Sequence, residues 1–254
     1  MKVTILGSGA AGGVPSISRG WGSCDPAEPR NRRRRPSILV EEGESRILVD
    51  TSPDCREQLL DAGVQRLSGV LYTHDHADHL HGIDDLREVN RAMGGPLPIH
   101  GAPEVIDSIR IRFPYVLGCV EEGQSIYKPM LEPHVIDGPF ELAGLSIHPI
   151  EQDHGFCRTL GFRFGDFAYS TDVVNMPPES FEILVGVKVW VIGCLTMHPH
   201  PTHAHLERVL EWIARIHPER AFLTHMTPSL DYETLQGCLP QGVEPAYDGM
   251  VIHI

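Results

Sequence analysis

The chain has 254 residues, of which 41% are hydrophobic, so it is long enough to bury a full core as one domain over residues 1–254. Its 34 acidic residues outnumber its 21 basic ones, and the net charge of −13 argues against a general nucleic-acid binder or a protein that binds anionic membranes. The sequence contains no apolar run of about 18 residues, so it predicts no membrane-spanning helix. The amino-terminal apolar run is too short for a signal peptide, and six scattered cysteines without a Cys-x-x-Cys pair indicate reduced thiols. We therefore expect a cytoplasmic protein.

The first predicted strand, Val3–Leu6, enters a glycine-rich loop, Gly7–Pro15. No amphipathic helix follows this loop, and Pro15 would interrupt one, which argues against a dinucleotide-binding fingerprint. The small residues instead favour a tight loop whose backbone passes close to a metal centre or a substrate. A basic run at residues 30–35 comes next and has two interpretations, a solvated face or a clamp for an anionic substrate.

Two apolar runs, Ser37–Val40 and Arg46–Val49, flank an acidic turn and predict a β-hairpin. A helix is expected directly after this hairpin. Ser52 is its predicted N-cap, Pro53 its first helical residue, and Gly63 its end.

The rest of the chain is expected to mix further strands and helices. The predicted helices cover residues 83–93, 104–113 and 203–216, and the predicted strands cover residues 97–100, 145–150, 159–164, 167–170, 187–192, 221–224 and 250–254. Residues 114–140 look irregular and are predicted to cap the site. Two strand-rich halves, each followed by helices without a regular β-α-β rhythm, are typical of an α/β protein that forms a four-layer αββα sandwich.

The sequence Thr-His-Asp-His-Ala-Asp-His follows a predicted buried strand, Gly69–Tyr72, and is the most informative stretch of the chain. Residues two apart in an extended segment point to the same side, so His74 and His76 can bind one metal ion together. Asp78 and His79 lie where the chain turns into a helix and suit a second ion. A polar loop that is rich in histidine by chance is the plain alternative, but divalent transition metals need this mixture of neutral nitrogen and anionic oxygen donors.

With this motif the chain resembles the metallo-β-lactamase superfamily of binuclear metallohydrolases. The resemblance implies that His154 completes the first metal site, that Asp172 bridges the two ions, and that His225 completes the second site. Each of these residues follows an apolar strand, where an ordinary hydrogen-bonded residue is the alternative. Asp50, at another strand end, is expected to orient a metal-binding imidazole. The expected metal ligands are therefore His74, His76, Asp78, His79, His154, Asp172 and His225.

The resemblance implies two divalent metal ions as cofactors, and the donor set suits zinc or manganese, with iron also possible. With two carboxylate ligands and a bridging hydroxide, the site would carry about +1 inside an acidic protein and attract an anion. Between two ions roughly 3.5–4 Å apart, such a hydroxide is a nucleophile at neutral pH. The expected partner is therefore a small phosphoester or a nucleotide-like substrate, not a long polyanion.

Within the superfamily, the chain is most similar to the phosphodiesterases of the phosphonate-breakdown (carbon–phosphorus lyase) pathway, which open cyclic ribose phosphates. Besides the metal motifs, the similar segments are residues 7–15, 34–37, 203–206 and 247–250. Those relatives hold a structural zinc with a Cys-x-Cys-x-x-Cys segment and a later His. In this chain the corresponding stretch keeps only Cys24, and Pro228 stands near the place of that His, so the chain is a divergent relative for which no such zinc is predicted.

The same resemblance gives His203 a catalytic role, together with Asp78 and Asp172 at the metal ions. His203 is predicted to lie at a helix start after Thr202, where free N–H groups and the helix dipole favour a bound anion. From there it would bind a phosphoryl oxygen or protonate the leaving alkoxide. A surface histidine at a helix end is the alternative.

The leading hypothesis is thus a binuclear metal-dependent phosphodiesterase acting on a small nucleotide-like or cyclic phosphoester. Three alternatives share the predicted ligands or the opening loop. The first is a lactone or thioester hydrolase, the second is a transfer-RNA processing nuclease, which would need a protruding basic arm, and the third is a non-catalytic carrier in cofactor biosynthesis. The resemblance also suggests a homodimer.

Overall fold

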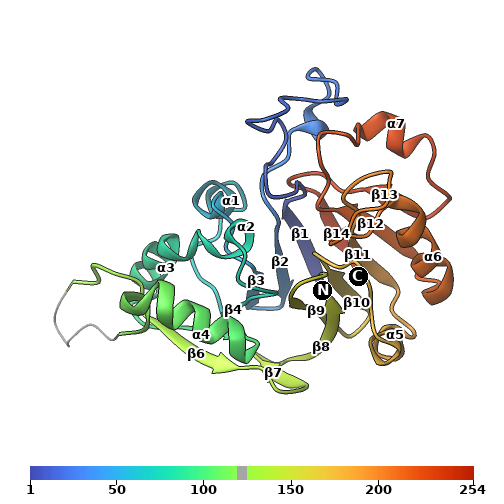
Figure 1. The fold of residues 1–254 in the computed structure, drawn as a ribbon. Coiled ribbons are helices and arrows are strands. Elements are labelled where there is room, and N and C mark those ends of the chain that lie inside the picture. Colours follow the sequence, from blue (N-terminus) through green and yellow to red (C-terminus); the bar gives the residue numbers. More distant parts are fainter. Residues whose placement is uncertain (119–124) are drawn as a thin grey trace.

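The computed structural model of the protein describes residues 1–118 and 125–254. Two seven-stranded sheets pack face to face, and helices cover their outer faces (Figure 1). The order of strands is β14-β1-β2-β3-β4-β5-β6 in the first sheet and β13-β12-β11-β10-β9-β8-β7 in the second. These four layers are the αββα sandwich that the sequence predicted.

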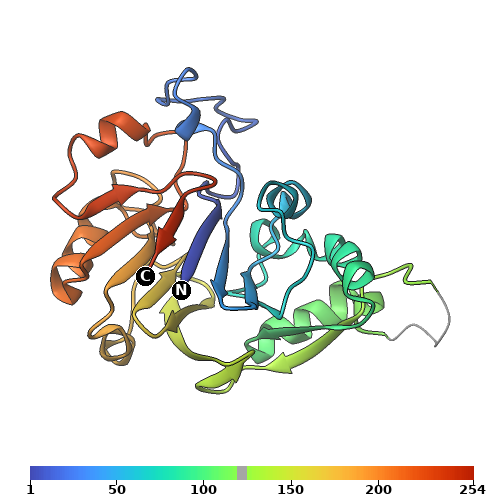
Figure 2. The ribbon, with the colours of Figure 1, turned by 180° about the vertical axis from the view of Figure 1, so that it is seen from behind.

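The first sheet is antiparallel at one side and parallel at the other. Its strands are β1 (Lys2–Gly7), β2 (Ser37–Glu42), β3 (Ser45–Val49), β4 (Gly69–Leu71), β5 (Leu97–Gly101), β6 (Leu131–Val135) and β14 (Val251–His253). Strands β3 to β6 run parallel, whereas β1 pairs antiparallel with both β2 and β14. The pairing of β1 with β14 brings the two ends of the chain side by side (Figure 2).

The second sheet has the same mixed design. Its strands are β7 (Phe140–Leu142), β8 (Leu145–Asp153), β9 (Arg158–Phe164), β10 (Phe167–Ser170), β11 (Val189–Gly193), β12 (Arg220–Thr224) and β13 (Val243–Pro245). Strands β10 to β13 run parallel, and β7 to β10 form an antiparallel meander. Consequently β8, β10, β11 and β12 all point their carboxyl ends to one edge of the sandwich.

The helices are divided between the two outer faces (Figure 1). The first half of the chain contributes α1 (Cys55–Asp61), α2 (Ala77–Leu80), α3 (Leu86–Met93) and α4 (Pro103–Arg112), and the second half contributes α5 (Pro178–Leu184), α6 (Leu206–Ile216) and α7 (Tyr232–Gln236). Short 3-10 turns lie at Pro29–Asn31, Ile83–Asp85 and Pro114–Leu117. Among the described residues, no helix has the length and apolar character that crossing a membrane requires.

The apolar side chains form two cores. The larger one fills the space between the sheets and continues under α1, α3 and α4, with Phe162 and Tyr169 contributed by the second sheet. The smaller one lies between the second sheet and helices α5 to α7, where Phe181 packs against Trp212 of α6. Both cores hold the strands rigidly, so the loops at the strand ends are presented from a fixed frame.

Residues 114–140 differ from the prediction. Residues 131–135 form β6, an edge strand parallel to β5, although they were expected to be irregular. Pro133 hid this strand, because proline is tolerated in a sheet only where no further strand needs its N–H group. None of the described residues between 114 and 140 lines the pocket described below, so the predicted cap is wrong for them; residues 119–124 lie outside the described part of the chain.

Two helices begin later than the sequence suggested. Helix α1 begins at Cys55, and the Ser52 hydroxyl accepts a 3.1 Å hydrogen bond from the Asp54 N–H group in the turn before it. Helix α6 begins at Leu206, so His203 lies in the preceding loop and not at a helix start. The argument that placed His203 in the field of a helix dipole is therefore wrong. The short elements β7, β13, α5 and α7 were not predicted.

Candidate metal centre

All seven predicted metal ligands meet at one edge of the sandwich, each just beyond the carboxyl end of a strand. His74, His76, Asp78 and His79 follow β4, and the other three follow β8, β10 and β12 of the second sheet. They form two donor groups that share Asp172, and within each group the donor atoms all lie within 4.8 Å of one another. We call them the outer group (His74, His76 and His154) and the inner group (Asp78, His79 and His225). Their division is the one that the sequence predicted.

Asp172 occupies the centre of the site. Its Oδ2 atom lies 3.7 Å from Nε2 of His74 and 3.5 Å from Nε2 of His154. Its Oδ1 atom lies 3.2 Å from Nε2 of His79 and 3.0 Å from Nε2 of His225. One carboxylate oxygen thus faces each donor group, which is the arrangement that a bridging ligand requires.

Three residues of the site have a left-handed backbone. Asp50, Asp172 and His225 have φ angles of 65°, 47° and 58°, and each lies one or two residues after a strand. Such angles are uncommon outside glycine and cost free energy, so their gathering at one place marks a functional site. The Thr159 hydroxyl holds this conformation at Asp172 by donating a 3.0 Å hydrogen bond to its carbonyl oxygen.

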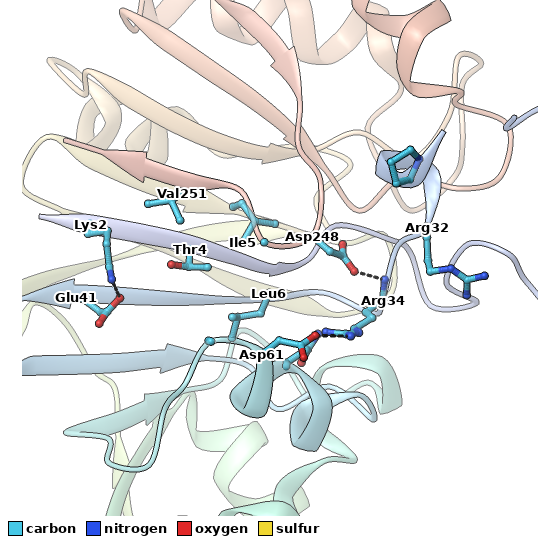
Figure 3. A pocket seen from close by; sticks show the side chains of 14 residues that line it. Lys2, Thr4, Ile5, Leu6, Arg32, Arg34, Glu41, Asp61, Asp248 and Val251 are labelled. Atoms are coloured by element: carbon cyan, nitrogen blue, oxygen red, sulfur yellow. Dashed lines mark hydrogen bonds and ion pairs between the residues drawn. The ribbon is translucent and has the colours of Figure 1, made fainter. Parts of the chain in front are cut away.

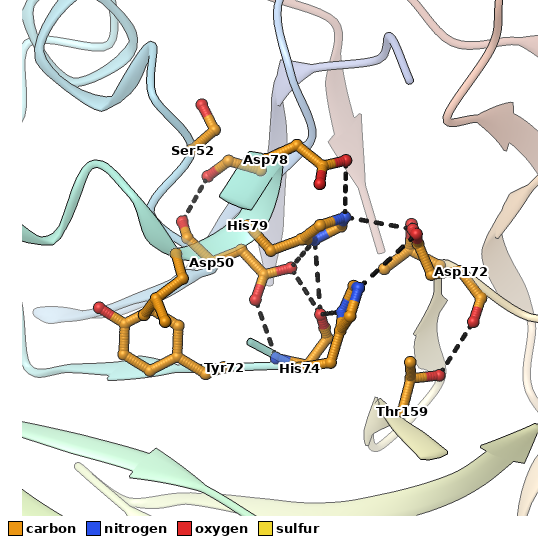
Figure 4. Close-up of polar contacts among 12 residues, drawn as sticks. Asp50, Ser52, Tyr72, His74, Asp78, His79, Thr159 and Asp172 are labelled. Atoms are coloured by element: carbon orange, nitrogen blue, oxygen red, sulfur yellow. Dashed lines mark hydrogen bonds and ion pairs between the residues drawn. The ribbon is translucent and has the colours of Figure 1, made fainter. Parts of the chain in front are cut away.

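The imidazole rings are oriented with Nε2 toward Asp172. Nδ1 of His79 donates to the Asp50 carboxylate at 2.7 Å, and Nδ1 of His154 donates to the Thr202 carbonyl oxygen at 2.7 Å. Nδ1 of His74 lies 3.0 Å from the Thr73 hydroxyl, which in turn donates to Asp50 at 2.8 Å (Figure 4). Asp50 therefore orients one imidazole directly and another through Thr73, as predicted for a carboxylate behind metal ligands.

The inward nitrogen atoms lack partners. Nε2 of His74 and Nε2 of His79 are buried and form no hydrogen bond within the described chain. Buried polar atoms are almost always satisfied, and an unsatisfied one carries a free-energy penalty. Nitrogen lone pairs that converge with carboxylate oxygens from two sides fit a divalent cation, so the residues present suit the metal ions that the fold implies.

The electrostatics of the site favour neutral rings at His74 and His154 and an ionised carboxylate at Asp172. Burial lowers the pKa of His154 to about 4, against the opposing charge of Asp172, so this ring is neutral at pH 7. Burial and the neighbouring His79 also hold the pKa of His74 well below its ordinary value. Burial alone would raise the pKa of Asp172, but His225 and His79 hold it well below the usual range, and Asp172 stays ionised.

The donor groups open into a pocket of about 310 Å³. Phe156 stands at its rim with 76% of its surface exposed, and its ring centroid lies 6.4 Å from that of His76 and 5.8 Å from that of His154. Ala10, Ala11 and Gly12 also line this pocket, so the glycine-rich loop passes beside the predicted metal ligands.

His203 lies in this pocket but in neither donor group. Its Nε2 atom is 3.2 Å from Oδ2 of Asp172, and its Nδ1 atom is 2.7 Å from the Thr202 hydroxyl. The ring stacks on that of His225 with a centroid distance of 5.1 Å. His203 is therefore brought to the site by the loop before α6, with one ring face against the inner group.

The basic run at residues 30–35 is partly solvated, because Arg32 is exposed, and most of its other arginines form ion pairs. Arg34 pairs with Asp61 at 2.6 Å (Figure 3) and Arg35 pairs with Asp54 at 2.7 Å, while Arg30 pairs with Glu28. Arg33 is 2% exposed and donates to the Thr227 carbonyl oxygen at 3.4 Å. None of the run lines the metal pocket, so these arginines fasten neighbouring segments together.

The glycines of the first loop are explained by this basic segment. A Cβ atom at Gly7 would lie 1.9 Å from the Arg35 carbonyl oxygen, and one at Gly9 would lie 2.9 Å from the Arg34 carbonyl oxygen. Only glycine allows the two backbones to approach so closely.

Thr73, Thr202 and Phe156 complete the site and were not predicted from the sequence. The two threonines support imidazole rings, and Phe156 borders the pocket. Each is directly beside, or two residues from, a predicted metal ligand or His203, which is the one signal that could have indicated them.

The comparison with known families agrees with this geometry. Residues 45–226 match the family model of the β-lactamase superfamily domain. The chain belongs to the metallo-β-lactamase superfamily. Its fold and its donor groups are those of a metal-dependent hydrolase of this superfamily, with divalent ions as the cofactors that the donor set suits.

One solved structure that the chain resembles is a diphosphatase from the PhnP family. It superposes with a TM-score of 0.91 and 32% identity, over 100% of this chain and 97% of that one. This likeness to the PhnP family confirms the relationship that the sequence motifs suggested, namely that to the phosphodiesterases of the phosphonate-breakdown pathway.

Two curated relatives carry other names. An octanoyltransferase from Porphyromonas gingivalis (strain ATCC BAA-308 / W83) is 33% identical over 98% of this chain and 51% of its own length. A ribonuclease Z from Bradyrhizobium sp. (strain ORS 278) is 39% identical over 54% of this chain and 46% of its own length. The chain spans about half the length of these curated relatives, so their names describe longer proteins.

Proposed function

We propose that the protein is a binuclear metal-dependent phosphodiesterase that acts on a small nucleotide-like or cyclic phosphoester. The observation that carries this proposal is His203, a histidine that touches the shared carboxylate of Asp172 but belongs to neither donor group. A site that only holds metal ions has no need for such a residue. The 32% identity to a diphosphatase along the whole chain supports hydrolysis at a phosphorus centre, the chemistry that a diphosphatase and a phosphodiesterase share.

Divalent ions in the two donor groups would supply Lewis acidity toward the phosphoryl oxygens and would lower the pKa of a water molecule. Asp78 and Asp172 would reduce the positive charge of the ions, because the neighbouring His79 and His225, against the opposing effect of burial, hold the pKa of both carboxylates low. Asp50 fixes the ring of His79, and Thr202 fixes the ring of His154, so that these two rings are held in place before substrate binds.

In this proposal His203 is the residue that donates a proton to the substrate. Its Nδ1 atom is held by the Thr202 hydroxyl, and its Nε2 atom donates toward Asp172 in the absence of substrate. With substrate in the pocket, the same Nε2–H group can donate to a phosphoryl oxygen or to the departing alkoxide. The stacking of the ring on His225 keeps it in this position.

A thioester hydrolase is the second candidate function. The observation in its favour is the octanoyltransferase whose sequence matches 98% of this chain at 33% identity. An acyl thioester presents a polarisable carbonyl group that the same ions could activate, and Phe156 and Leu195 give the pocket an apolar wall. This reaction has no particular requirement for His203, because a thiolate leaves without protonation.

The two functions are separated by turnover measurements on metal-loaded protein. Bis(p-nitrophenyl) phosphate and S-octanoyl-N-acetylcysteamine would be offered to wild type, His203→Gln and His198→Gln, with manganese or zinc present. We expect phosphodiester turnover by wild type and a kcat about 10²- to 10⁴-fold lower for His203→Gln at unchanged metal content.

His198 is the matched control, because it is an exposed histidine of the same loop that does not line the pocket. His198→Gln is expected to keep its rate within about twofold of wild type. Turnover of the thioester alone, with both metal ions bound, would replace the phosphodiesterase proposal with the second candidate.

A further inference from the structure

The histidine cluster contains one carboxylate that neither donor group uses. Asp75 lies between His74 and His76 of the outer group, but its oxygen atoms belong to neither donor group. Side chains alternate in an extended segment, so Asp75 is directed away from the side that the two histidines share. Its Oδ2 atom accepts a 2.6 Å hydrogen bond from the Ser108 hydroxyl of helix α4. The metal-binding loop is therefore tied to a helix that contributes none of the predicted metal ligands.

Arg112, the last residue of α4, contacts the same loop at more than one point. Its Nη1 atom donates to the Asp75 carbonyl oxygen at 2.6 Å and to Oδ2 of Asp75 at 3.3 Å. The guanidinium also contacts Nε2 of His81, the residue that directly follows α2. Arg112 therefore spans the short helix α2, with contacts before it and after it.

Helix α4 gives these contacts a rigid support. Val105, Ile106 and Ile109 are buried in the larger core, whereas Ser108 and Arg112 lie one turn apart on the side that meets the metal-binding loop. A packed helix holds its side chains in place more precisely than a loop does. The position of Asp75 is consequently set by an element that is itself fixed in the core.

The hydrogen bond to the Asp75 carbonyl oxygen acts on the backbone of His76. This oxygen belongs to the peptide group that joins Asp75 to His76, and a planar peptide group moves as one unit. The next carbonyl oxygen, that of His76 itself, accepts hydrogen bonds from the N–H groups of His79 and Leu80 at 3.1 and 3.0 Å. Both peptide groups that flank His76 are thus held, so its side chain leaves the backbone from a fixed position.

An ordinary surface ion pair is the alternative explanation of Arg112. Such pairs contribute little, because water and salt screen them. Arg110 of the same helix forms one of this kind. It pairs with Asp107 at 2.8 Å, and it makes no hydrogen bond to the metal-binding loop within the part of the chain that the structure describes. Arg112 differs because it donates to a backbone carbonyl group next to a predicted metal ligand.

We propose that Arg112 is a positioning residue of the outer donor group, which holds His76 where it can bind an ion, with Asp75 and Ser108 as its partners. The proposal goes beyond the phosphodiesterase function, because it concerns metal binding and holds for whichever bond the centre hydrolyses. Loss of Arg112 frees the peptide group before His76 and weakens the binding of the outer ion. The inner ion keeps its affinity, because Asp50 holds its ligand His79 independently of α4.

Cobalt titration of the metal-free protein, followed by visible absorption, tests this without any turnover. The absorption of the outer ion is assigned with His76→Gln, which removes one of its ligands. In Arg112→Met we expect the outer ion to bind about 10- to 100-fold more weakly and the affinity of the inner ion to change less than about twofold. In Arg112→Lys an ammonium group can still donate to the Asp75 carbonyl oxygen, so most of the lost affinity should return.

Arg110→Met is the matched control, because it removes an arginine and an ion pair from the same helix and leaves the contacts to the loop in place. Its affinities for both ions should equal those of wild type. Ser108→Ala is a milder variant that keeps the hydrogen bonds from Arg112 to Asp75, so the outer ion should be weakened less than in Arg112→Met.

Two results would overturn the proposal. The first is a wild-type affinity for the outer ion in Arg112→Met. The second is an equal loss of affinity for both ions, which would indicate a general loosening of the fold. Neither result bears on the phosphodiesterase function, which is decided by the turnover of wild type and His203→Gln.

Discussion

The inner and outer donor groups share one carboxylate but differ in burial and in support. Every residue of the inner group is buried, whereas His76 of the outer group is partly exposed at the pocket. The Asp50 carboxylate holds His79 of the inner group at 2.7 Å, but no side-chain hydrogen bond orients His76 within the described chain. Both groups contribute residues to the pocket wall, but only the outer group has a donor, His76, that is partly exposed and lacks a side-chain hydrogen bond.

This difference in burial and support predicts a difference in how tightly the two groups bind their ions. A buried and well-oriented donor set binds an ion tightly, because its ligands lose little freedom on binding. A donor set with one free ring can adjust as substrate enters. We therefore expect the inner group to bind its ion more tightly and the outer group to exchange its ion more readily.

Loss of the shared carboxylate should have the largest effect, because Asp172 serves both groups. Asp172→Asn removes a buried negative charge that faces four imidazole rings. Removing one partner of a buried charge pair typically costs about 3–5 kcal/mol of free energy. We expect both ions to bind roughly 10²- to 10⁴-fold more weakly and phosphodiester turnover to disappear. Metal content by mass spectrometry and turnover at saturating manganese check this. Retention of two tightly bound ions would show that Asp172 is not a shared ligand.

A smaller and more selective effect is expected for Asp50→Asn. The substitution weakens the hydrogen bond to Nδ1 of His79, and the affinity of the inner group should fall about 10- to 100-fold. Asp50 reaches the outer group only indirectly, through Thr73 and His74, and His154 is oriented by Thr202, so the outer ion should be affected less. Cobalt titration followed by visible absorption distinguishes the two ions.

Asp61→Asn is the matched control for Asp50→Asn. Asp61 is an exposed carboxylate that pairs with Arg34 at the surface, so its loss should leave both affinities unchanged. An equal loss of affinity at both donor groups in Asp50→Asn would contradict the contrast between them.

The smallest effect should come from Phe156→Ala. Its ring lies against the rings of His76 and His154 of the outer group. Among the described residues it makes no such ring–ring contact with the inner group. Removal of an exposed ring should raise KM for aromatic phosphodiesters about two- to tenfold, leaving kcat and metal content unchanged. Steady-state kinetics with bis(p-nitrophenyl) phosphate provide the measurement. A large drop in kcat at normal metal content would instead place Phe156 in the chemistry itself.

The structure brings the seven predicted donors together, and the sequence signals for them were of two kinds, a local histidine cluster and a family resemblance. A histidine cluster directly after an apolar strand needs no tertiary information, and His154, Asp172 and His225 each follow such a strand. The alternation of side chains in extended chain paired His74 with His76, whereas the places of His154, Asp172 and His225 came from the family resemblance. The fold class followed in the same way from the strand pattern.

Other features depend on contacts between distant segments and could not be predicted. The support of His154 by the Thr202 carbonyl oxygen joins residues 48 positions apart, and the burial of Arg33 depends on a loop nearly 200 residues away. Edge strand β6 was hidden by Pro133, which reads as a loop signal until its place at the sheet edge is known. The start of α6 was misjudged because the polar residues before Leu206 resemble a helix beginning.

The donors of the site come from both halves of the sandwich: four follow strand β4 of the first sheet, and three follow strands of the second. An ion held by His74 and Asp172 therefore acts as a cross-link between the two sheets. Such an ion would close a loop of about 100 residues. For a covalent cross-link of that loop length, the chain-entropy model gives an increase in the free energy of unfolding of about 4–5 kcal/mol. The catalytic ions would then also serve as structural fasteners, and a cell short of metal would lose the stability of this fold together with its activity.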